Sequence, residues 1–364
     1  MGDGDFVQLL TPDGERTERA VGHDGVEYTV DLTDDEYRGL YRDMVVTRRL
    51  DAEGVALQRQ GEMALWASLY GQEAAQIGSG RALRPQDMVF PSYREHGVLT
   101  ARGLDPLLPF GLFRGVDQGA WDPEAYKTHM YTLVVGAQTL HATGYAMGVT
   151  LDGRIGDDGE AVIVYFGDGA TAQGDVNESF IWAGVHQAPI VFFCQNNQYA
   201  ISVGTERQSR APIHRRSAGF GFPGLRVDGN DVLASYAVTR HAMDRARRGG
   251  GPTLIEAYTY RMGAHTTSDD PTRYRLAAEQ EAWAARDPIA RLATFLRRQQ
   301  LADEDFFVKI EEEVQHLAVG LRERVVNLPN PGRSAIFDHA YAHGSPLVEQ
   351  QRARFEAYAT SFES

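Results

Sequence analysis

Ala161-Val162-Ile163-Val164-Tyr165-Phe166-Gly167-Asp168-Gly169 is the stretch of this 364-residue sequence that decides the fold. Six apolar residues in a row predict a strand that is buried on both faces, which is typical of a parallel sheet. A second such run, residues 189–194, follows after one predicted helix and ends at Gln195-Asn196-Asn197. The order strand, helix, strand predicts two parallel strands whose polar ends meet at one edge of a sheet.

The same alternation continues on both sides of this unit. Helical patterns cover residues 137–149, 175–187 and 231–248, and further strands are predicted at residues 225–228 and 253–261. Strands that alternate with helices in this way pack as a parallel sheet with helices on both faces. We therefore predict an α/β fold.

Helical extensions are predicted at both ends of the chain. Thr33-Asp34-Asp35-Glu36 has the spacing of a capping box and predicts the start of an amphipathic helix. A helix over residues 72–83 and a short strand within residues 87–93 follow, and the tail from residue 279 is helical, with its longest helix at residues 304–326. We interpret residues 1–32 as an arm that is ordered only where it packs, and residues 33–364 as a single domain.

Composition excludes several classes of function. The net charge of −14 argues against nucleic acid as a partner. No apolar run reaches the roughly 18 residues that a membrane span needs. Residues 1–5 are acidic and lack the basic start of a signal peptide. Cys194, the single cysteine, lies in an apolar run and is interpreted as a small buried hydrophobe, so a cytoplasmic location is expected.

The polar ends of the two central strands predict a site for a metal and a phosphate. Asp168 lies between two glycines, and Asn197 follows the next strand, with Tyr199 two residues on. A carboxylate, an amide oxygen and a backbone carbonyl suit Mg²⁺, and backbone N–H groups at a helix start can bind phosphate. Gly-Asp-Gly alone is a common turn. Its pairing with Asn196-Asn197 across one strand–helix–strand unit favours the functional interpretation.

The segment from Gly167 to Asn197 resembles the thiamine-diphosphate motif of thiamine-dependent enzymes. Longer matches resemble the alpha subunits of pyruvate and branched-chain 2-oxo acid dehydrogenases, namely Tyr93-Arg94-Glu95, residues 136–142, 167–175, 195–202 and 261–270. The likeness runs in order from about residue 35 to residue 345, and several motifs in order make it specific. The resemblance implies the thiamine-diphosphate-binding fold.

The resemblance also implies a role for each matching residue. Asp168 and Asn197 would bind Mg²⁺ through their side chains, and Tyr199 through its main-chain oxygen. The other residues implied in cofactor binding are Tyr93, Arg94, Val135, Gly167, Gly169, Ala170 and Gln195. His265 matches a histidine near the diphosphate and the reacting carbon, where a group with a pKa near neutrality can handle protons.

Thiamine chemistry needs a carboxylate beside the aminopyrimidine ring, and the family places that glutamate on a second domain. Only one α/β domain is apparent here, so the resemblance implies a separate beta subunit in an assembly of two alpha and two beta chains. The implied reaction is oxidative decarboxylation of a branched-chain 2-oxo acid, with reductive acylation of a lipoyl group on an acyltransferase component. The segments at residues 202–212 and 263–274 are expected beside the site and are predicted to order when the cofactor binds.

Three alternatives stay open. The substrate could be pyruvate or acetoin, since only residues 93–97 resemble the branched-chain members more closely. A non-catalytic regulatory subunit would be expected to have lost one of Asp168, Asn197, Arg94 or His265. A magnesium phosphohydrolase would need a carboxylate pair, and only Asp175 and Glu178 lie near Asp168.

Two apparent motifs are set aside. Residues 219–224 fit the dinucleotide-binding pattern G-x-G-x-x-G, but no good strand precedes them and no helix follows. The histidines lack the spacing of a zinc site.

Overall fold

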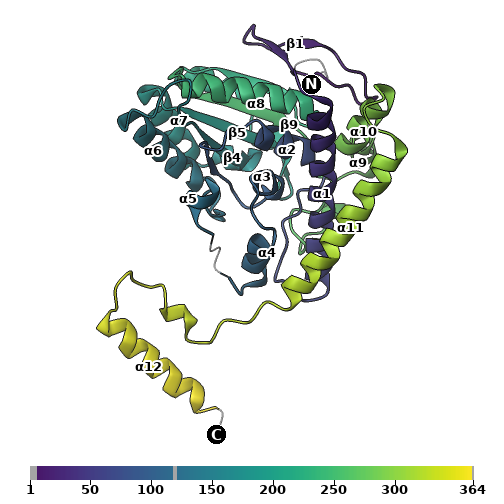
Figure 1. Ribbon diagram of the computed structural model, residues 1–364. Helices are drawn as coiled ribbons and strands as arrows, with labels where there is room; N and C mark the ends of the chain where they lie inside the picture. Colours follow the sequence, from purple (N-terminus) through teal and green to yellow (C-terminus); the bar gives the residue numbers. More distant parts are fainter. Residues whose placement is uncertain (1–5, 118–120, 363–364) are drawn as a thin grey trace.

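The computed structural model describes residues 6–117 and 121–362, and in these residues a five-stranded parallel sheet has the order β3-β4-β5-β9-β8 (Figure 1). The strands are β3 (Met88–Phe90), β4 (Val162–Gly167), β5 (Ile190–Asn196), β8 (Gly224–Asp228) and β9 (Thr253–Tyr258). β4 and β5 pair in register from Val162 opposite Ile190 to Gly167 opposite Gln195. Because the two strands end together, the residues that follow them start at one edge of the sheet.

Helices cover both faces of the sheet, so the predicted α/β fold is confirmed. α6 (Ala137–Leu151) and α7 (Gly174–His186) pack on one face, against Val162 and Val164 among others. α2 (Glu73–Arg81) and α8 (Val232–Arg247) pack on the other face, with Ile163 and Tyr165. Successive side chains of a strand point to opposite faces. The continuous apolar run of β4 therefore supplies both halves of the core.

Long helices at the two ends of the chain pack beside this core. α1 (Asp34–Arg59) begins at Thr33 with the predicted capping box, and it contacts α11 (Glu304–Val326), whose bounds match the prediction. The shorter helices are α3 (His96–Ala101), α4 (Leu107–Arg114), α5 (Pro123–Tyr126), α9 (Ala277–Ala284) and α10 (Pro288–Arg298). None of the described helices has the length and apolar character that crossing a membrane requires.

The described part of the N-terminal arm packs on the sheet edge. Val7 bridges to Val227 of β8, and the main-chain N–H groups of Leu9 and Leu10 donate to the Asp231 carboxylate at 2.7 and 2.6 Å. Farther along, β1 (Arg19–Val21) and β2 (Glu27–Thr29) form a small hairpin. Residues 1–5, whose acidic composition argued against a signal peptide, lie outside the described residues.

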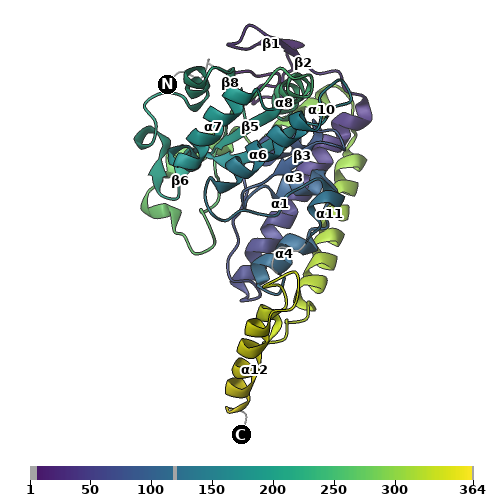
Figure 2. The same cartoon turned by 90° about the vertical axis from the view of Figure 1, so that its left-hand side faces the viewer.

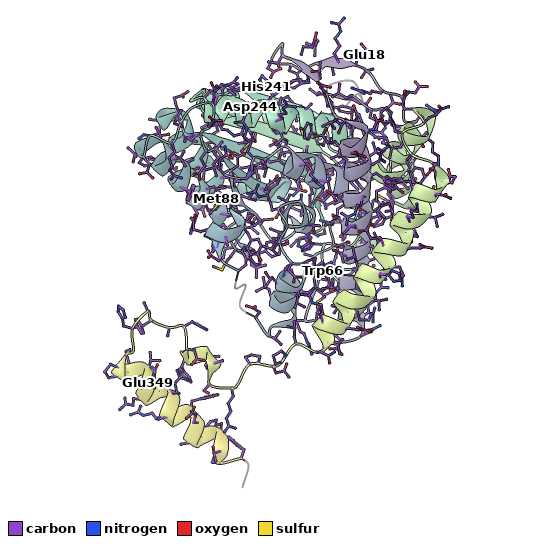
Figure 3. The ribbon with its side chains drawn as sticks, viewed as in Figure 1. Glu18, Trp66, Met88, His241, Asp244 and Glu349 are labelled. Atoms are coloured by element: carbon purple, nitrogen blue, oxygen red, sulfur yellow. The ribbon has the colours of Figure 1, made fainter. Side chains whose placement is uncertain are left out.

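The C-terminal segment lies apart from the rest of the molecule. α12 (Pro346–Thr360) stands beyond the end of α11 in two perpendicular views (Figures 1 and 2). Its closest neighbour is the 3-10 turn Ala335–Phe337, and within α12 only Val348 is buried. Glu349 of this helix is likewise remote from the main body (Figure 3). The helix was predicted only as part of a helical tail, since sequence does not give its position.

Two local differences from the predicted elements both lie beside the strand ends. β9 ends at Tyr258 and not at Arg261. Beyond it, the main-chain N–H of Thr259 still donates to the carbonyl of Asn196, which is opposite Tyr258, and the N–H of Arg261 donates to the carbonyl of Asn197. A 3-10 turn, Asp168–Ala172, comes between β4 and α7.

The G-x-G-x-x-G segment follows a 3-10 helix, Ile213–Phe220, and leads into β8. This arrangement agrees with the rejection of a dinucleotide site.

Candidate active site

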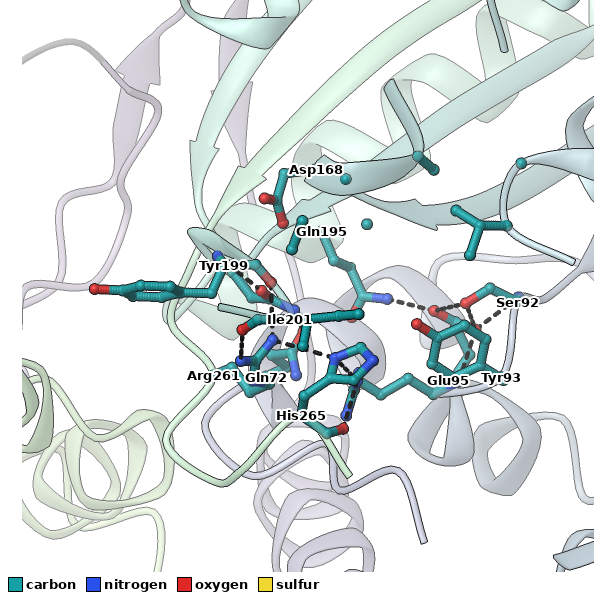
Figure 4. Close-up of a pocket in the computed structure, with 18 of the residues that line it drawn as sticks. Gln72, Ser92, Tyr93, Glu95, Asp168, Gln195, Tyr199, Ile201, Arg261 and His265 are labelled. Atoms are coloured by element: carbon teal, nitrogen blue, oxygen red, sulfur yellow. Dashed lines mark hydrogen bonds between the residues drawn. The ribbon is translucent and has the colours of Figure 1, made fainter. Parts of the chain in front are cut away.

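A pocket of about 230 Å³ lies at the carboxyl ends of β3, β4, β5 and β9 (Figure 4). Every residue to which the sequence assigned a cofactor, metal or catalytic role lines it: Tyr93, Arg94, Val135, Gly167, Asp168, Gly169, Ala170, Gln195, Asn197, Tyr199 and His265. Ligands of open α/β sheets bind at this edge. The structure thus brings the candidates together, while their individual roles stay predictions.

Asp168 places a carboxylate at the end of β4. Its side chain is 1% exposed, and its Oδ2 accepts hydrogen bonds from Thr205 Oγ1 and Gln208 Nε2, both at 3.1 Å. In the described ranges no lysine, arginine or histidine forms an ion pair with it. Burial raises the pKa of Asp168; the two hydrogen bonds, and the charge of Arg261, which forms no ion pair with it, only partly oppose this. A buried carboxylate without a positive partner is costly, so the site suits a cation.

Asn197 and Tyr199 bring further oxygen atoms to the same place. Asn197 Nδ2 donates to Gln72 Oε1 at 3.1 Å. The amide oxygen, Asn197 Oδ1, therefore points to the other side, where it accepts from the main-chain N–H of Tyr199 at 3.3 Å. Gly169 allows the segment Tyr199–Ala200 to lie close to the end of β4, because a Cβ atom at position 169 would lie 2.7 Å from the Ala200 Cβ. Carboxylate, amide and main-chain oxygens form a donor set that fits Mg²⁺.

Glu95 organises the turn that follows β3. Its buried carboxylate accepts hydrogen bonds from Ser92 N at 2.7 Å and Ser92 Oγ at 2.9 Å, and from Gln195 Nε2 at 2.7 Å. Gln195 Oε1 in turn accepts from Gln76 Nε2 at 3.0 Å. Gln195, a predicted diphosphate contact, is therefore fixed at both ends of its amide. Burial raises the pKa of Glu95, against hydrogen bonds from Ser92 and Arg94 that lower it.

Replacement of Glu95 by glutamine is expected to destabilise the protein by roughly 1–3 kcal/mol, because an NH₂ group would then face buried donors. Denaturant unfolding at neutral pH measures the change. Glu178→Gln, at an exposed position of α7, is the matched control and should leave the midpoint unchanged. Equal stability of Glu95→Gln and the wild type would mean that Glu95 is protonated in the folded protein and donates a hydrogen bond itself.

Arg94 and Arg261 give the pocket a positive wall. Both are buried, and neither has a carboxylate partner within the described part of the chain. Arg94 donates to the carbonyls of Ser68 and His265, and Arg261 to those of Tyr199 and Ile201, while Arg261 Nε has no hydrogen-bond partner there. Buried guanidinium groups without an anion are costly. The wall therefore suits a polyanion such as a diphosphate, which arginine binds in pairs of hydrogen bonds.

His265 lies between these two arginines. Its Nδ1 is 3.3 Å from Arg94 Nη2 and 3.4 Å from Arg261 Nη1. A guanidinium can only donate, so Nδ1 must accept, and the ring is neutral with its proton on Nε2. Burial, followed by the charges of Arg94 and Arg261, lowers the pKa of His265 to about 3, so the near-neutral pKa predicted from the sequence is wrong for this structure. In this state His265 can donate a hydrogen bond from Nε2.

The opposite wall is less polar. Val135 is 43% exposed, and Gly136, with φ +91°, begins α6. Gln138 donates from Nε2 to the carbonyl of Tyr165 at 2.8 Å, and its buried Oε1 has no partner among the residues described. Together with Ala170, these residues offer a small apolar surface beside one free acceptor.

Sequence reasoning missed several residues of the pocket and its surroundings. Gln72, Glu95 and Arg261 line it. Thr205 and Gln208, which follow β7 (Val203–Gly204), bond to Asp168; the sequence predicted residues 202–212 beside the site but did not name these two. Glu95 and Arg261 stood inside the quoted motifs, Glu95 directly after Arg94 and Arg261 four residues before His265. Their contacts depend on how the loops turn, for which the sequence offered no signal.

Comparison with known proteins agrees with this geometry. The family model described as Dehydrogenase E1 component matches residues 41–319. The 3-methyl-2-oxobutanoate dehydrogenase subunit alpha of Mycobacterium tuberculosis (strain H37Rv) is 44% identical over 352 residues, covering 96% of this chain and 93% of that protein. The pyruvate dehydrogenase E1 component subunit alpha of Acholeplasma laidlawii is 39% identical over 88% of this chain and 92% of its own length. The chain belongs to the dehydrogenase E1 component family.

Proposed function

We propose that this chain is the alpha subunit of the E1 component of a 2-oxo acid dehydrogenase, an oxidoreductase, and that its pocket binds thiamine diphosphate together with Mg²⁺. The observation that carries the proposal is the charge arrangement: Asp168 is buried without a positive partner, and Arg94 and Arg261 are buried without a negative one. A cation and a diphosphate supply both missing partners at once.

The residues divide into two groups by the part of the cofactor they would hold. Asp168, Asn197 and the main-chain oxygen of Tyr199 would bind Mg²⁺, while Arg94, Gln195, Tyr93 and the N–H groups of Gly169 and Ala170 would bind the diphosphate. Val135 and Gly167 would contact the rest of the cofactor. When bound, thiamine diphosphate supplies a nucleophilic carbon and an electron sink for decarboxylation of a 2-oxo acid.

His265 would act on the substrate side. With Nδ1 occupied by the arginines, its Nε2–H can donate to an oxygen that gains negative charge during the reaction. The Tyr93 ring packs edge-on against it, with centroids 6.3 Å apart, and limits its rotation.

The pocket lacks one group that thiamine chemistry needs. Asp168 and Glu95 are its only acidic lining residues in the described ranges, and both already accept hydrogen bonds, which supports a carboxylate for the aminopyrimidine from another chain. A beta subunit is the partner that the E1 component implies. We propose an assembly of two alpha and two beta chains, which acylates a lipoyl group on an acyltransferase component. A cytoplasmic location stays a prediction from the single cysteine.

We propose a branched-chain 2-oxo acid as the substrate, with pyruvate as the alternative. The Mycobacterium tuberculosis relative is named for 3-methyl-2-oxobutanoate and is 44% identical, whereas the Bacillus subtilis relative is named for pyruvate and is 40% identical over 78% of this chain. Residues 93–97 resemble the branched-chain members, as noted above. The higher identity to the relative named for 3-methyl-2-oxobutanoate supports the first substrate.

Reconstitution tests the proposed function. The chain purified with its beta subunit should decarboxylate the 2-oxo acids derived from valine, leucine and isoleucine, with thiamine diphosphate, Mg²⁺ and an artificial electron acceptor. The chain alone should be inactive, because it lacks the second carboxylate. A preference for pyruvate would support the same mechanism with pyruvate as the substrate. Absence of both activity and calorimetric cofactor binding would support the regulatory subunit instead.

A further inference from the structure

We infer that a second cavity, beside the cofactor pocket, is a binding site for a small molecule that carries both a carboxylate and an ammonium group, namely an aliphatic α-amino acid. The cavity has a volume of about 420 Å³, which is enough for a ligand of this size. Tyr199 of β6 (Tyr199–Ala200) lines both cavities. Thr205, which lines the second cavity, donates to Asp168 at 3.1 Å, so the inferred site adjoins the predicted metal ligand.

Arg226 is the positively charged group of this cavity. Its side chain is 7% exposed, and its Nε has no hydrogen-bond partner among the described residues. Its ion pair with Glu256 spans 3.5 Å, and the Tyr258 ring covers one face of the guanidinium, 3.9 Å from its central carbon. A buried guanidinium with unmade hydrogen bonds is costly. It therefore suits the carboxylate of a ligand, which arginine can bind through two parallel hydrogen bonds.

Glu256 does not satisfy Arg226, because its carboxylate is occupied by other donors. Oε2 accepts hydrogen bonds from the main-chain N–H and from Nδ1 of His214, at 3.0 and 2.9 Å, and Oε1 accepts one from Asn196 Nδ2 at 2.7 Å. Arg291, by contrast, is equally buried and donates directly to a carboxylate at 2.7 Å. Arg226 thus has room for an acceptor that the described part of the chain does not supply.

Carboxylates at the rim of the cavity supply the opposite charge. Glu279 is half-buried and held in place, since it accepts a hydrogen bond from the Tyr199 hydroxyl at 2.8 Å, and Glu206 is exposed. A purely anionic ligand would be repelled by these carboxylates, and a purely cationic one by Arg226. A ligand with both charges meets a partner for each of them.

The remaining wall of the cavity is apolar and determines what else the ligand carries. Ala211, Pro212 and Ile213 line it, and Ile213 is almost completely buried. Apolar side chains beside a few placed charges are typical of sites for small organic ligands. An aliphatic side chain on the ligand would cover this wall, which is why an aliphatic α-amino acid fits better than a small polar one.

Calorimetric titration with L-valine tests the inference on the full-length chain in complex with its beta subunit, without thiamine diphosphate or Mg²⁺. Isovalerate lacks the ammonium group of L-valine, and isobutylamine lacks its carboxylate. Each should bind about tenfold or more weakly than L-valine, because one charged contact is lost. Arg226→Met should weaken the binding of both L-valine and isovalerate by about the same factor. Glu279→Gln should weaken the binding of L-valine and leave that of isovalerate unchanged.

Arg245→Met is the matched control, because Arg245 is half-buried, donates to the carbonyls of Gly251 and Pro252 and does not line the cavity. It should bind L-valine as the wild type does. No binding of L-valine at millimolar concentration, equal affinity for isovalerate, or unchanged binding in Arg226→Met would each overturn the inference. If Arg226→Met does not fold, Glu279→Gln decides, and wild-type affinity for L-valine there overturns it. Since no cofactor or turnover is involved, these results are separable from a failure of the proposed function.

Discussion

Replacement of Asp168 by asparagine is expected to weaken binding of Mg²⁺ and thiamine diphosphate by roughly 30- to 4,000-fold, which corresponds to about 2–5 kcal/mol for loss of one partner of a buried charge pair. Asparagine keeps the shape of the side chain and one acceptor oxygen. It removes the negative charge of a buried carboxylate that forms no ion pair within the described part of the chain. Activity at limiting cofactor concentration should fall by the same factor.

The same substitution should have the opposite effect on the cofactor-free protein. There the charge of Asp168 is buried and uncompensated, so its removal should leave the protein as stable as the wild type or more stable. Thermal unfolding with and without Mg²⁺ and thiamine diphosphate therefore gives a paired test. Only the wild type should gain a large stabilisation from the cofactor.

Asp175→Asn is the matched control for this test. Asp175 lies in the first turn of α7, seven residues after Asp168, and does not line the pocket. It should bind the cofactor as the wild type does. Equal losses in Asp168→Asn and Asp175→Asn would point to a general effect of negative charge near the helix start, and would contradict a specific metal ligand at Asp168.

Apolar runs made the fold predictable from the sequence. β4 and β5 are buried on both faces, so each appears in the sequence as a short continuous apolar run that predicts a strand. The strand–helix–strand order then predicts that the two strands pair in parallel. Asp168 and Asn197 then followed as neighbours at the sheet edge. The roles of the surrounding residues came from the resemblance, which assigned them position by position.

Contacts made by loops were beyond sequence reasoning. Arg261 and Glu95 were visible in the quoted motifs, but which carbonyls Arg261 meets depends on the early end of β9 at Tyr258 and on the left-handed turn at Ile201. Glu95 reads as an ordinary acidic residue until the fold buries it against Ser92 and Gln195. The sequence contains no periodic pattern that predicts the contacts of Arg261 or the burial of Glu95, because both depend on packing between segments that are distant in the sequence.

Replacement of His265 by alanine is expected to lower kcat by roughly 100- to 10,000-fold, the range typical for loss of a positioned proton donor or acceptor. Cofactor affinity should change little, since the guanidinium groups of Arg94 and Arg261 remain. Steady-state kinetics with calorimetry separates the two effects. His186→Ala, at an exposed position of α7 outside the pocket, is the control and should behave as the wild type does. A large loss of affinity with unchanged kcat would assign His265 to binding only.

The protonation of His265 should also respond to the cofactor. Burial and the charges of Arg94 and Arg261 hold its pKa at about 3 in the cofactor-free protein, so the ring is neutral at pH 6. A bound diphosphate places negative charge against those arginines and raises this pKa from about 3, so proton uptake by the wild type on binding should be larger near pH 4 than near pH 6. Calorimetry in buffers of different ionisation enthalpy measures that uptake. It should vanish in His265→Ala, and uptake that persists there would mean that another group takes up the proton.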